Sequence, residues 1–251
     1  EVMGNAAANI TPVTLELGGK SPNLVLADAD LAEAVPVILR AIIQNAGQTC
    51  SAGTRVIVDR RIEADLVDAL AERMASVRMG PGIEDPDMGP LISEAQLTRV
   101  AGYVDRGRRD GARLLAGGGR PDDPALARGF FFEPTLFTGV KPNAVIAQEE
   151  IFGPVLVSLP FADIDEAVRL ANDTPYGLVC AIWTRDIDRA LWVAGRLDSG
   201  QVFINTYGAG GGVELPFGGW KHSGFGREKG LEAVVAYTQT KTVAVRIRKP
   251  S

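Results

Sequence analysis

A cysteine stands among small and polar residues in the segment Gly-Gln-Thr-Cys-Ser-Ala-Gly, which runs from Gly47 to Gly53. Glycines on both sides favour a turn between two regular elements, so the Cys50 thiol is predicted to be accessible. An accessible thiol is a nucleophile once a base removes its proton. The alternative for Cys50 is a buried structural thiol, which we predict for Cys180 because it lies inside the apolar run 178–182.

A single carboxylate lies upstream of this cysteine. Glu16 belongs to the predicted strand Val13–Leu17, and the pair Gly18-Gly19 that follows would let the backbone come close to a ligand. Alternation on a solvent face or a surface salt bridge would also explain Glu16. If apolar neighbours desolvate the carboxylate instead, its pKa rises toward neutrality, as a general base requires. A thiol and such a base are sufficient for covalent catalysis through a thioester.

A second acidic segment combines two carboxylates with an aromatic residue and a turn. This segment is Glu149-Glu150-Ile151-Phe152-Gly153-Pro154. It is either a capped loop or a site where a carboxylate accepts hydrogen bonds from sugar hydroxyls, with the aromatic residue packed beside a flat ring. His222, the only histidine, is the base that a cysteine hydrolase would need. It lies in a polar loop, and the residues around Cys50 differ from those of papain or caspase nucleophiles, so a surface position is predicted.

Composition excludes several classes of function. The 251-residue chain has a formal net charge of −5, which gives no electrostatic reason to expect nucleic acid or an anionic membrane as partner. Its apolar fraction of 46% is that of an ordinary soluble protein, and no apolar run reaches the roughly 18 residues that span a bilayer. Two cysteines make no disulfide framework, and this usage fits a reducing, cytoplasmic location.

The elements that must position these residues alternate along the chain. Helices are predicted at 31–45, 63–76, 93–109, 163–172 and 186–197. Strands are predicted at 13–17, 23–26, 55–58, 112–116, 130–138, 155–159, 178–183 and 201–205. This order indicates βαβ units, and therefore an α/β fold with a mostly parallel sheet covered by helices on both faces, in three αβα layers.

The C-terminal part breaks this rhythm. Residues 206–230 are dense in glycine and are predicted to be mainly loop, followed by a short helix at 231–237. Thr240–Arg248 alternates apolar and charged residues at a period of two. An exposed strand of this kind at a chain end offers unpaired backbone groups to a partner, so it predicts subunit assembly.

Four segments of the chain carry a resemblance to a known family. They are Val-Thr-Leu-Glu-Leu-Gly-Gly-Lys-Ser-Pro at 13–22, Asn-Ala-Gly-Gln-Thr-Cys at 45–50, Glu-Glu-Ile-Phe-Gly-Pro at 149–154 and Pro-Phe-Gly-Gly-Trp-Lys-His-Ser-Gly-Phe-Gly-Arg-Glu at 216–228. In this order they closely resemble the signatures of the NAD(P)-dependent aldehyde dehydrogenase superfamily. The resemblance covers nearly the whole chain but only the C-terminal, catalytic half of a family member, so we expect the sequence to be a piece of a longer protein.

The resemblance implies a reaction and a role for each matched residue. At the position of Cys50 the family has the nucleophile that attacks a small-molecule aldehyde, and hydride then passes to NAD or NADP. Glu16 matches the glutamate that activates water to hydrolyse the resulting thioester to a carboxylic acid. Glu228 matches a glutamate proposed to relay protons in parts of the family. Phe217 falls where an aromatic residue often lines the aldehyde pocket.

The resemblance also implies contacts with the cofactor. Glu150 matches the glutamate that holds the nicotinamide ribose, and Phe152 matches the aromatic residue beside it. Leu17 matches a residue whose backbone meets the nicotinamide carboxamide. We assign no metal ligands.

The implied domain organisation divides the chain into four parts. Residues 1–18 are expected to be the tail of the dinucleotide-binding domain, 19–222 the catalytic domain, 223–237 a return segment and 238–251 an oligomerisation strand with the C-terminus. Family members form dimers and tetramers, so a homodimer or homotetramer is expected. Two parts of the family's active site fall in the other half: the pyrophosphate site, and an asparagine whose side chain donates a hydrogen bond to the oxyanion. We therefore expect this chain alone not to carry out cofactor-linked oxidation.

Two alternatives remain open besides the cysteine hydrolase. A relative that transfers the acyl group to coenzyme A would share most of these motifs, although Glu16 at the position of the hydrolytic base favours hydrolysis. A fragment that only assembles with partner subunits through its terminal strand would catalyse nothing. The sequence does not identify the aldehyde, and the choice between NAD and NADP depends on residues outside this chain.

Overall fold

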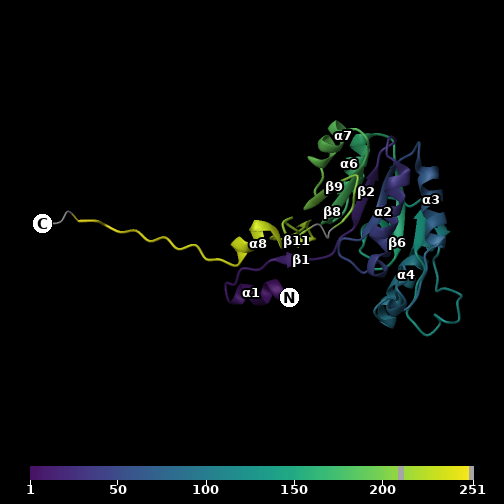
Figure 1. Ribbon diagram of the computed structural model, residues 1–251, viewed down its shortest axis with the longest axis horizontal. Helices are drawn as coiled ribbons and strands as arrows, with labels where there is room; N and C mark the ends of the chain where they lie inside the picture. The colour runs from purple at the N-terminus through teal and green to yellow at the C-terminus, as the bar shows by residue number, and fades with distance from the viewer. Residues whose placement is uncertain (209–211, 249–251) are drawn as a thin grey trace.

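The computed structural model describes residues 1–208 and 212–248. Seven strands form one sheet in the order β4-β5-β6-β3-β2-β8-β9 (Figure 1). Neighbours pair in parallel except β4 and β5, which are antiparallel. The bounds are β2 Ser21–Val25, β3 Gly53–Asp59, β4 Arg113–Ala116, β5 Thr135–Thr138, β6 Val155–Phe161, β8 Val179–Trp183 and β9 Gln201–Ile204. The predicted mostly parallel sheet is confirmed.

Helices cover both faces of this sheet. They are α2 Leu31–Ile43, α3 Glu63–Ala75, α4 Glu94–Arg109, α5 Val145–Gln148, α6 Ile164–Asn172 and α7 Ile187–Ala194, with 3₁₀ turns η1 Gln44–Gly47 and η2 Gly82–Glu84. The parallel crossover through α2 runs along the sheet in the direction opposite to those through α6 and α7, so right-handed connections place α2 on the face opposite to α6 and α7. Helix α3 packs on α2 and shares its face, and the predicted three-layer fold is confirmed. None of the described helices is both long and apolar enough to cross a membrane.

Polar side chains fix where the helices begin. Asp30, Ser93, Asp163 and Asp186 precede α2, α4, α6 and α7, and each accepts a hydrogen bond from a backbone N–H in the first turn. Such N-caps satisfy donors that have no partner inside the helix. The predicted helix starts are therefore confirmed to within a residue or two, and α2 ends at η1, two residues before the predicted Asn45.

The loops that enter the parallel strands meet at one edge of the sheet. Residues 18–20 precede β2, residues 48–52 precede β3 and residues 150–154 precede β6. Since neighbouring parallel strands share one direction, their amino ends lie side by side. This edge brings together the cysteine, glycine-pair and acidic segments of the sequence.

The predicted strand Val13–Leu17 is mostly wrong. Only β1, Leu15–Glu16, is a strand, and it pairs antiparallel with β11, Gly224–Phe225, outside the large sheet. A strand reaches only as far as its hydrogen-bonded partner, and β11 has two residues. A second small sheet joins β7, Tyr176–Gly177, to β10, Trp220–Lys221, so the region predicted as mainly loop also supplies short strands.

The predicted strand at Thr240–Arg248, part of the proposed oligomerisation segment 238–251, does not form in this single chain. Helix α8, Gly230–Ala236, confirms the predicted short helix, and the chain then runs away from the sheet with no strand up to residue 248 (Figure 1). A strand requires backbone hydrogen bonds to a neighbour, and no described segment lies beside this one. Residues 249–251 of the prediction lie outside the described residues. The N-terminal helix α1, Val2–Ala8, is likewise without buried residues.

Two glycines on α4 should respond oppositely to alanine. A Cβ at Gly102 would meet nothing within 4 Å, so Gly102→Ala should raise the free energy of unfolding by about 0.5–1 kcal/mol through helix propensity. A Cβ at Gly107 would lie 2.9 Å from Ile146 Cδ1 and 3.3 Å from Phe137 Cζ, so Gly107→Ala should lower it by about 1–3 kcal/mol. Denaturant unfolding of both variants checks this, and equal effects would contradict the packing described for α4.

Candidate active site

The cysteine lies on a strained turn between α2 and β3. Asn45, Ala46 and Gly47 have φ values of 52°, 54° and 73°, a left-handed run that is costly for residues with a side chain. The Gln48 side chain holds this run: its Nε2 donates to the Asn45 carbonyl over 2.9 Å, and its Oε1 accepts from the Ile92 N–H over 2.9 Å. A Cβ at Gly47 would collide with the Gly153 carbonyl. The predicted turn between two regular elements is confirmed, but it is more buried than expected, with residues 48–50 half-buried and residues 51–53 buried.

Cys50 is half-buried at the end of this turn. The Tyr207 hydroxyl donates a hydrogen bond of 2.6 Å to the carbonyl of the next residue, Ser51, and ties the turn to the segment after β9. Burial raises the pKa of the Cys50 thiol, the charges of Glu150 and Glu16 raise it further, and the Ser51 N–H partly opposes them. The thiol is therefore protonated at neutral pH and needs a base before it can attack.

The glycine pair brings three motifs into contact. A Cβ at Gly19 would collide with the Cys50 carbonyl oxygen, and a Cβ at Gly18 would lie 2.8 Å from the carboxyl carbon of Glu150. The Gly19 N–H donates to Glu150 Oε1 over 3.0 Å. The glycines were predicted to let the backbone approach a ligand. They also allow the cysteine turn and the acidic loop to pack against this segment, because a side chain at either position would push them apart.

Glu16 has the environment expected for a general base. Both carboxylate oxygens are buried and accept no hydrogen bond from any residue in the described part of the chain. Burial, with the negative charge of Glu228, raises the pKa of Glu16 to about 7, and Arg227 partly opposes this. This environment is the one predicted for a desolvated carboxylate, and the catalytic role of Glu16 stays a prediction.

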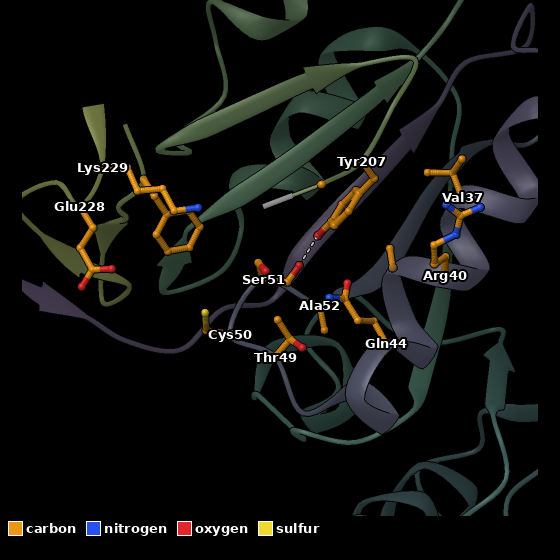
Figure 2. Close-up of a pocket in the computed structure, with 13 residues that line it drawn as sticks. Val37, Arg40, Gln44, Thr49, Cys50, Ser51, Ala52, Tyr207, Glu228 and Lys229 are labelled. Carbon is orange, nitrogen blue, oxygen red and sulfur yellow. Dashed lines mark hydrogen bonds between the residues drawn. The ribbon is translucent and has the colours of Figure 1, made fainter. Parts of the chain in front are cut away.

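A pocket of about 450 Å³ opens beside the thiol (Figure 2). Cys50, Phe217 and Glu228 line it together, as the resemblance implied for an aldehyde pocket. The Phe217 ring packs on Leu178 and Val179, and Cys50 contacts the same cluster. Phe217 and Glu228 also exchange backbone hydrogen bonds of 2.6 and 2.7 Å. Glu16 and Glu150 are not part of the lining, so the base is set back from the aldehyde space.

Other residues that line the pocket were not predicted from the sequence. Figure 2 shows Val37 and Arg40 on α2, and Gln44 at the start of η1, on one side of the pocket, with Glu228 and Lys229 opposite. Val37, Arg40 and Gln44 are spaced by three and four residues, so they lie on one face of α2 and of the turn that continues it. That spacing was visible in the sequence, but only the position of the turn with Cys50 relative to α2 shows that this face meets a pocket.

The acidic loop is fixed by α4. Arg99 Nη2 donates to the Glu150 carbonyl over 2.7 Å, and Gln96 Nε2 donates to the Phe152 carbonyl over 2.7 Å. Phe152 has a φ of 61°, a left-handed conformation that this clamp maintains. No sequence pattern indicated these two hydrogen bonds, because α4 is distant from the loop along the chain.

The residues expected at a nicotinamide ribose fit that group chemically. Glu150 uses Oε1 for the Gly19 N–H, and its half-buried carboxylate has a second oxygen that can accept from a hydroxyl. Leu17 is 45% exposed, and its N–H already donates to the Ser223 carbonyl over 3.1 Å. Its own carbonyl is therefore the backbone group that could meet a carboxamide.

The structure does not bring together Cys50 and His222, the two residues that a cysteine hydrolase would need. His222 is exposed, its N–H donates to the Pro175 carbonyl over 2.9 Å, and it does not line the pocket with Cys50. Cys180 is fully buried in β8, as predicted, and burial raises the pKa of its thiol. Within residues 1–208 and 212–248, no three His, Cys, Asp or Glu side chains cluster in a way that could hold a metal ion.

Comparison with known proteins agrees with this geometry. A sequence model of the aldehyde dehydrogenase family matches residues 1–243. A betaine aldehyde dehydrogenase of Brucella anthropi is 43% identical over 249 residues, which are 99% of this chain and 51% of that protein. A putative aldehyde dehydrogenase from Burkholderia cenocepacia is 54% identical with a TM-score of 0.94, covering 98% of this chain and 51% of its own.

An NAD⁺ complex of an aldehyde dehydrogenase from Bacillus cereus is 44% identical with a TM-score of 0.94, covering 98% of this chain and 50% of its own. The chain thus spans about half the length of the curated relatives it matches. Its assignment to the C-terminal half rests on the order of the four motifs and stays a prediction. Since the family model matches nearly all of the sequence and the shared fold extends over it, the chain belongs to the aldehyde dehydrogenase family.

Proposed function

We propose that this chain supplies the covalent chemistry by which an NAD-dependent aldehyde dehydrogenase oxidises an aldehyde to a carboxylic acid. The observation that carries the proposal is the contact at Gly19, where the turn of Cys50 and the segment of Glu16 lie together beside a pocket. A nucleophile, a base with a pKa of about 7 and a ligand space in one place are what thioester chemistry requires.

In the first step, the Cys50 thiol gives its proton to a solvent water molecule, and its sulfur adds to the aldehyde carbonyl carbon. The oxyanion that forms needs hydrogen-bond donors, and the Cys50 N–H is one candidate. Bound NAD⁺ would accept the hydride from this carbon, and the product left on Cys50 is a thioester. The apolar packing of Phe217 on Leu178 and Val179 keeps water from this side of the pocket.

In the second step, Glu16 takes a proton from the water that attacks the thioester carbon. Collapse of that adduct breaks the carbon–sulfur bond, releases the carboxylic acid and returns the thiolate of Cys50. A base with a pKa near 7 is half ionised at neutral pH and can accept this proton. Its position behind the pocket lining separates hydrolysis from hydride transfer.

The cofactor would be held partly by this chain. We assign Glu150 to the nicotinamide ribose hydroxyls, Phe152 to the space beside it and the Leu17 carbonyl to the carboxamide. The NAD⁺ complex of the Bacillus cereus relative supports NAD as the cofactor. The pocket volume of about 450 Å³ suits a small-molecule aldehyde, and the betaine aldehyde dehydrogenases among the relatives make betaine aldehyde the first one to test.

Assembly is part of the proposal. Val243, Val245 and Ile247 are exposed and fall at every second position along the tail, which suits a strand added to a neighbouring subunit. A homodimer or homotetramer would give this segment the backbone partners that the single chain does not provide.

Product analysis tests the proposed function. This chain, supplied together with the other half that is expected to carry the oxyanion asparagine and the pyrophosphate site, is incubated with NAD⁺ and betaine aldehyde or a simple aliphatic aldehyde, with and without coenzyme A. A carboxylic acid formed in equal amount to NADH, and independent of coenzyme A, supports it. An acyl-CoA product would favour the acyl-transfer alternative, and absence of both products would favour a fragment that only assembles.

The pH dependence of deacylation should respond to the two charges beside Glu16. Glu228→Gln removes a negative charge that raises the pKa of Glu16, so the rise in deacylation rate with pH should move to lower pH by about half to one unit. Arg227→Gln removes the opposing positive charge and should move it to higher pH. Rate profiles from pH 5 to 9 with an activated ester measure both, and shifts in the same direction would contradict Glu16 as the base.

A further inference from the structure

Tyr207 makes a hydrogen bond that the mechanism above does not use. The residue follows β9, and its hydroxyl donates over 2.6 Å to the carbonyl of Ser51, the residue directly after the nucleophile (Figure 2). Its ring lines the pocket together with Cys50. The polar group of this side chain is therefore engaged by the cysteine turn, and only the ring is offered to a ligand.

This bond completes the turn that carries the nucleophile. The Ala52 N–H donates to the Thr49 carbonyl over 3.0 Å, so Cys50 and Ser51 are the two central residues of a turn. The peptide group between Ser51 and Ala52 is then held at both ends, its N–H by Thr49 and its carbonyl by Tyr207. Among the residues that the structure describes, no other side chain makes a hydrogen bond to the backbone of this turn.

The segment that presents Tyr207 is itself fixed. Asn205 has a φ of 52°, a left-handed conformation, and its side chain exchanges two hydrogen bonds of 3.0 and 2.8 Å with the backbone of Thr184. The Asn205 N–H donates to the Ile182 carbonyl over 2.8 Å. The Tyr207 ring packs on Phe203, with the ring centroids 6.4 Å apart. The hydroxyl is therefore anchored to the ends of β8 and β9.

A glycine makes room for the phenol beside the turn. A Cβ at Gly53 would lie 3.4 Å from Tyr207 Cζ and 2.7 Å from Asn23 Nδ2. Burial raises the pKa of the Tyr207 hydroxyl, and Ser21 partly opposes this rise. The hydroxyl thus stays protonated at neutral and moderately alkaline pH, so it can donate to the turn throughout that range.

The Cys50 N–H is the group that depends on the shape of this turn. It donates to no acceptor in the described part of the chain. A free backbone donor beside a nucleophile can bind the negative oxygen that forms when the sulfur adds to a carbonyl carbon. Such a donor is effective only while its direction is kept, since a displacement of about 1 Å can lower the rate by about 10²-fold.

We propose that Tyr207 is a positioning residue for the oxyanion donor, and that its hydroxyl holds the turn in the shape that directs the Cys50 N–H into the pocket. The inference rests on the proposed function, in which Cys50 is the nucleophile. The hydroxyl bonds to the turn and exchanges no proton with the substrate, so its removal should act through geometry alone.

The first experiment compares two reactions of the same thiol in the wild type and in Tyr207→Phe, with the other half of the enzyme supplied. Hydrolysis of p-nitrophenyl acetate passes through oxyanions, whereas alkylation by iodoacetamide forms none. Tyr207→Phe should lower kcat for the ester by about 10- to 100-fold and leave KM within about twofold. The rate constant for alkylation of the Cys50 thiolate should change by less than about twofold.

The alkylation constant is taken from a pH profile, so that a change in the fraction of thiolate does not enter. The modified peptide is identified by mass, because Cys180 is a second thiol. An equal loss in both reactions would overturn the proposal, since the hydroxyl would then support the thiol or the fold in general. Ester hydrolysis at the wild-type rate would overturn it as well.

Tyr103→Phe is the matched control. It also removes a hydroxyl with a short hydrogen bond, of 2.7 Å to Glu149, but Tyr103 does not line the pocket beside Cys50. Both reactions should proceed in this variant at the wild-type rate. A loss of ester hydrolysis equal to that of Tyr207→Phe would overturn the proposal, because the effect would not be specific to the turn.

A second variant restores the donor. Tyr207→4-aminophenylalanine places an N–H group where the hydroxyl was, and should return kcat to within about threefold of the wild type. A rate as low as that of Tyr207→Phe would show that the hydrogen bond is not the cause. Tyr207→Phe leaves the Ser51 carbonyl without its donor, so its Tm should fall by about 2–8 °C. The assays are therefore run well below the lowest Tm.

Failure of the inference and failure of the proposed function give different results. If Cys50→Ser hydrolyses the ester at the wild-type rate, Cys50 is not the nucleophile, and the proposed function and the inference are both wrong. If Cys50→Ser abolishes hydrolysis and Tyr207→Phe does not slow it, only the inference is wrong.

Discussion

Replacing Cys50 with serine is expected to lower the rate of aldehyde oxidation by about 10³-fold or more while the protein stays folded. A serine hydroxyl has a far higher pKa than a thiol and is a much weaker nucleophile without strong activation. The substitution is nearly isosteric at a half-buried position, so the free energy of unfolding should change by less than about 1 kcal/mol. NADH formation and the hydrolysis of an activated ester both measure the effect.

The other thiol is the matched control. Cys180→Ser or Cys180→Ala changes a fully buried residue of β8 that does not line the pocket. Its effect should fall on stability, by about 1–2 kcal/mol, and leave the rate per folded molecule intact. Comparable loss of activity in the Cys50 and Cys180 variants would mean that Cys50 acts through the fold and is not the nucleophile.

Replacing Glu16 with glutamine should trap the acyl-enzyme. Without the base, acylation of Cys50 by an activated ester continues but water attacks the thioester slowly, so steady turnover should fall by about 10²- to 10⁴-fold. A burst of product equal to the amount of protein should precede it, and intact mass should rise by one acyl group. The burst shows that acylation still occurs, so it distinguishes the loss of Glu16 from the loss of a residue that is needed for acylation.

Glu72→Gln is the control for this prediction, because Glu72 is exposed on α3 and does not line the pocket beside Cys50. It should show wild-type turnover and no trapped acyl group. If Glu16→Gln turned over the ester at the wild-type rate, another group would have to activate the water. The buried carboxylate would then need a different explanation.

The parts of the fold that depend on local chemistry were predictable. N-caps such as Asp30 and Ser93 fixed the helix starts, and apolar runs such as Val155–Leu159 fixed the central strands, because each depends on neighbours in the chain. The order of four motifs was sufficient to bring Cys50, Glu16 and Glu150 into one hypothesis. Their convergence at the amino ends of the strands was not predicted, since ligands of open parallel sheets usually bind at the carboxyl ends.

The parts that depend on partners distant in sequence were missed. Leu15–Glu16 is short because β11 is short, and the tail at 240–248 is no strand because nothing pairs with it. In the sequence Lys20 is a polar residue after two glycines, and its complete burial follows only from the packing of β2, β3 and α6 around it. Alternation and composition describe one segment at a time and contain no information on such contacts.

The hydrogen bonds around the site join residues that are far apart along the chain. The Ser223 hydroxyl donates to the Gly18 carbonyl across 205 residues, Tyr207 reaches Ser51 across 156, and Gly19 reaches Glu150 across 131. Contacts of such sequence separation form late, since loop closure must precede them. A nascent or partly unfolded chain should therefore carry Cys50 as an ordinary thiol, and its reactivity toward aldehydes would arise only when synthesis and folding of these 223 residues are complete.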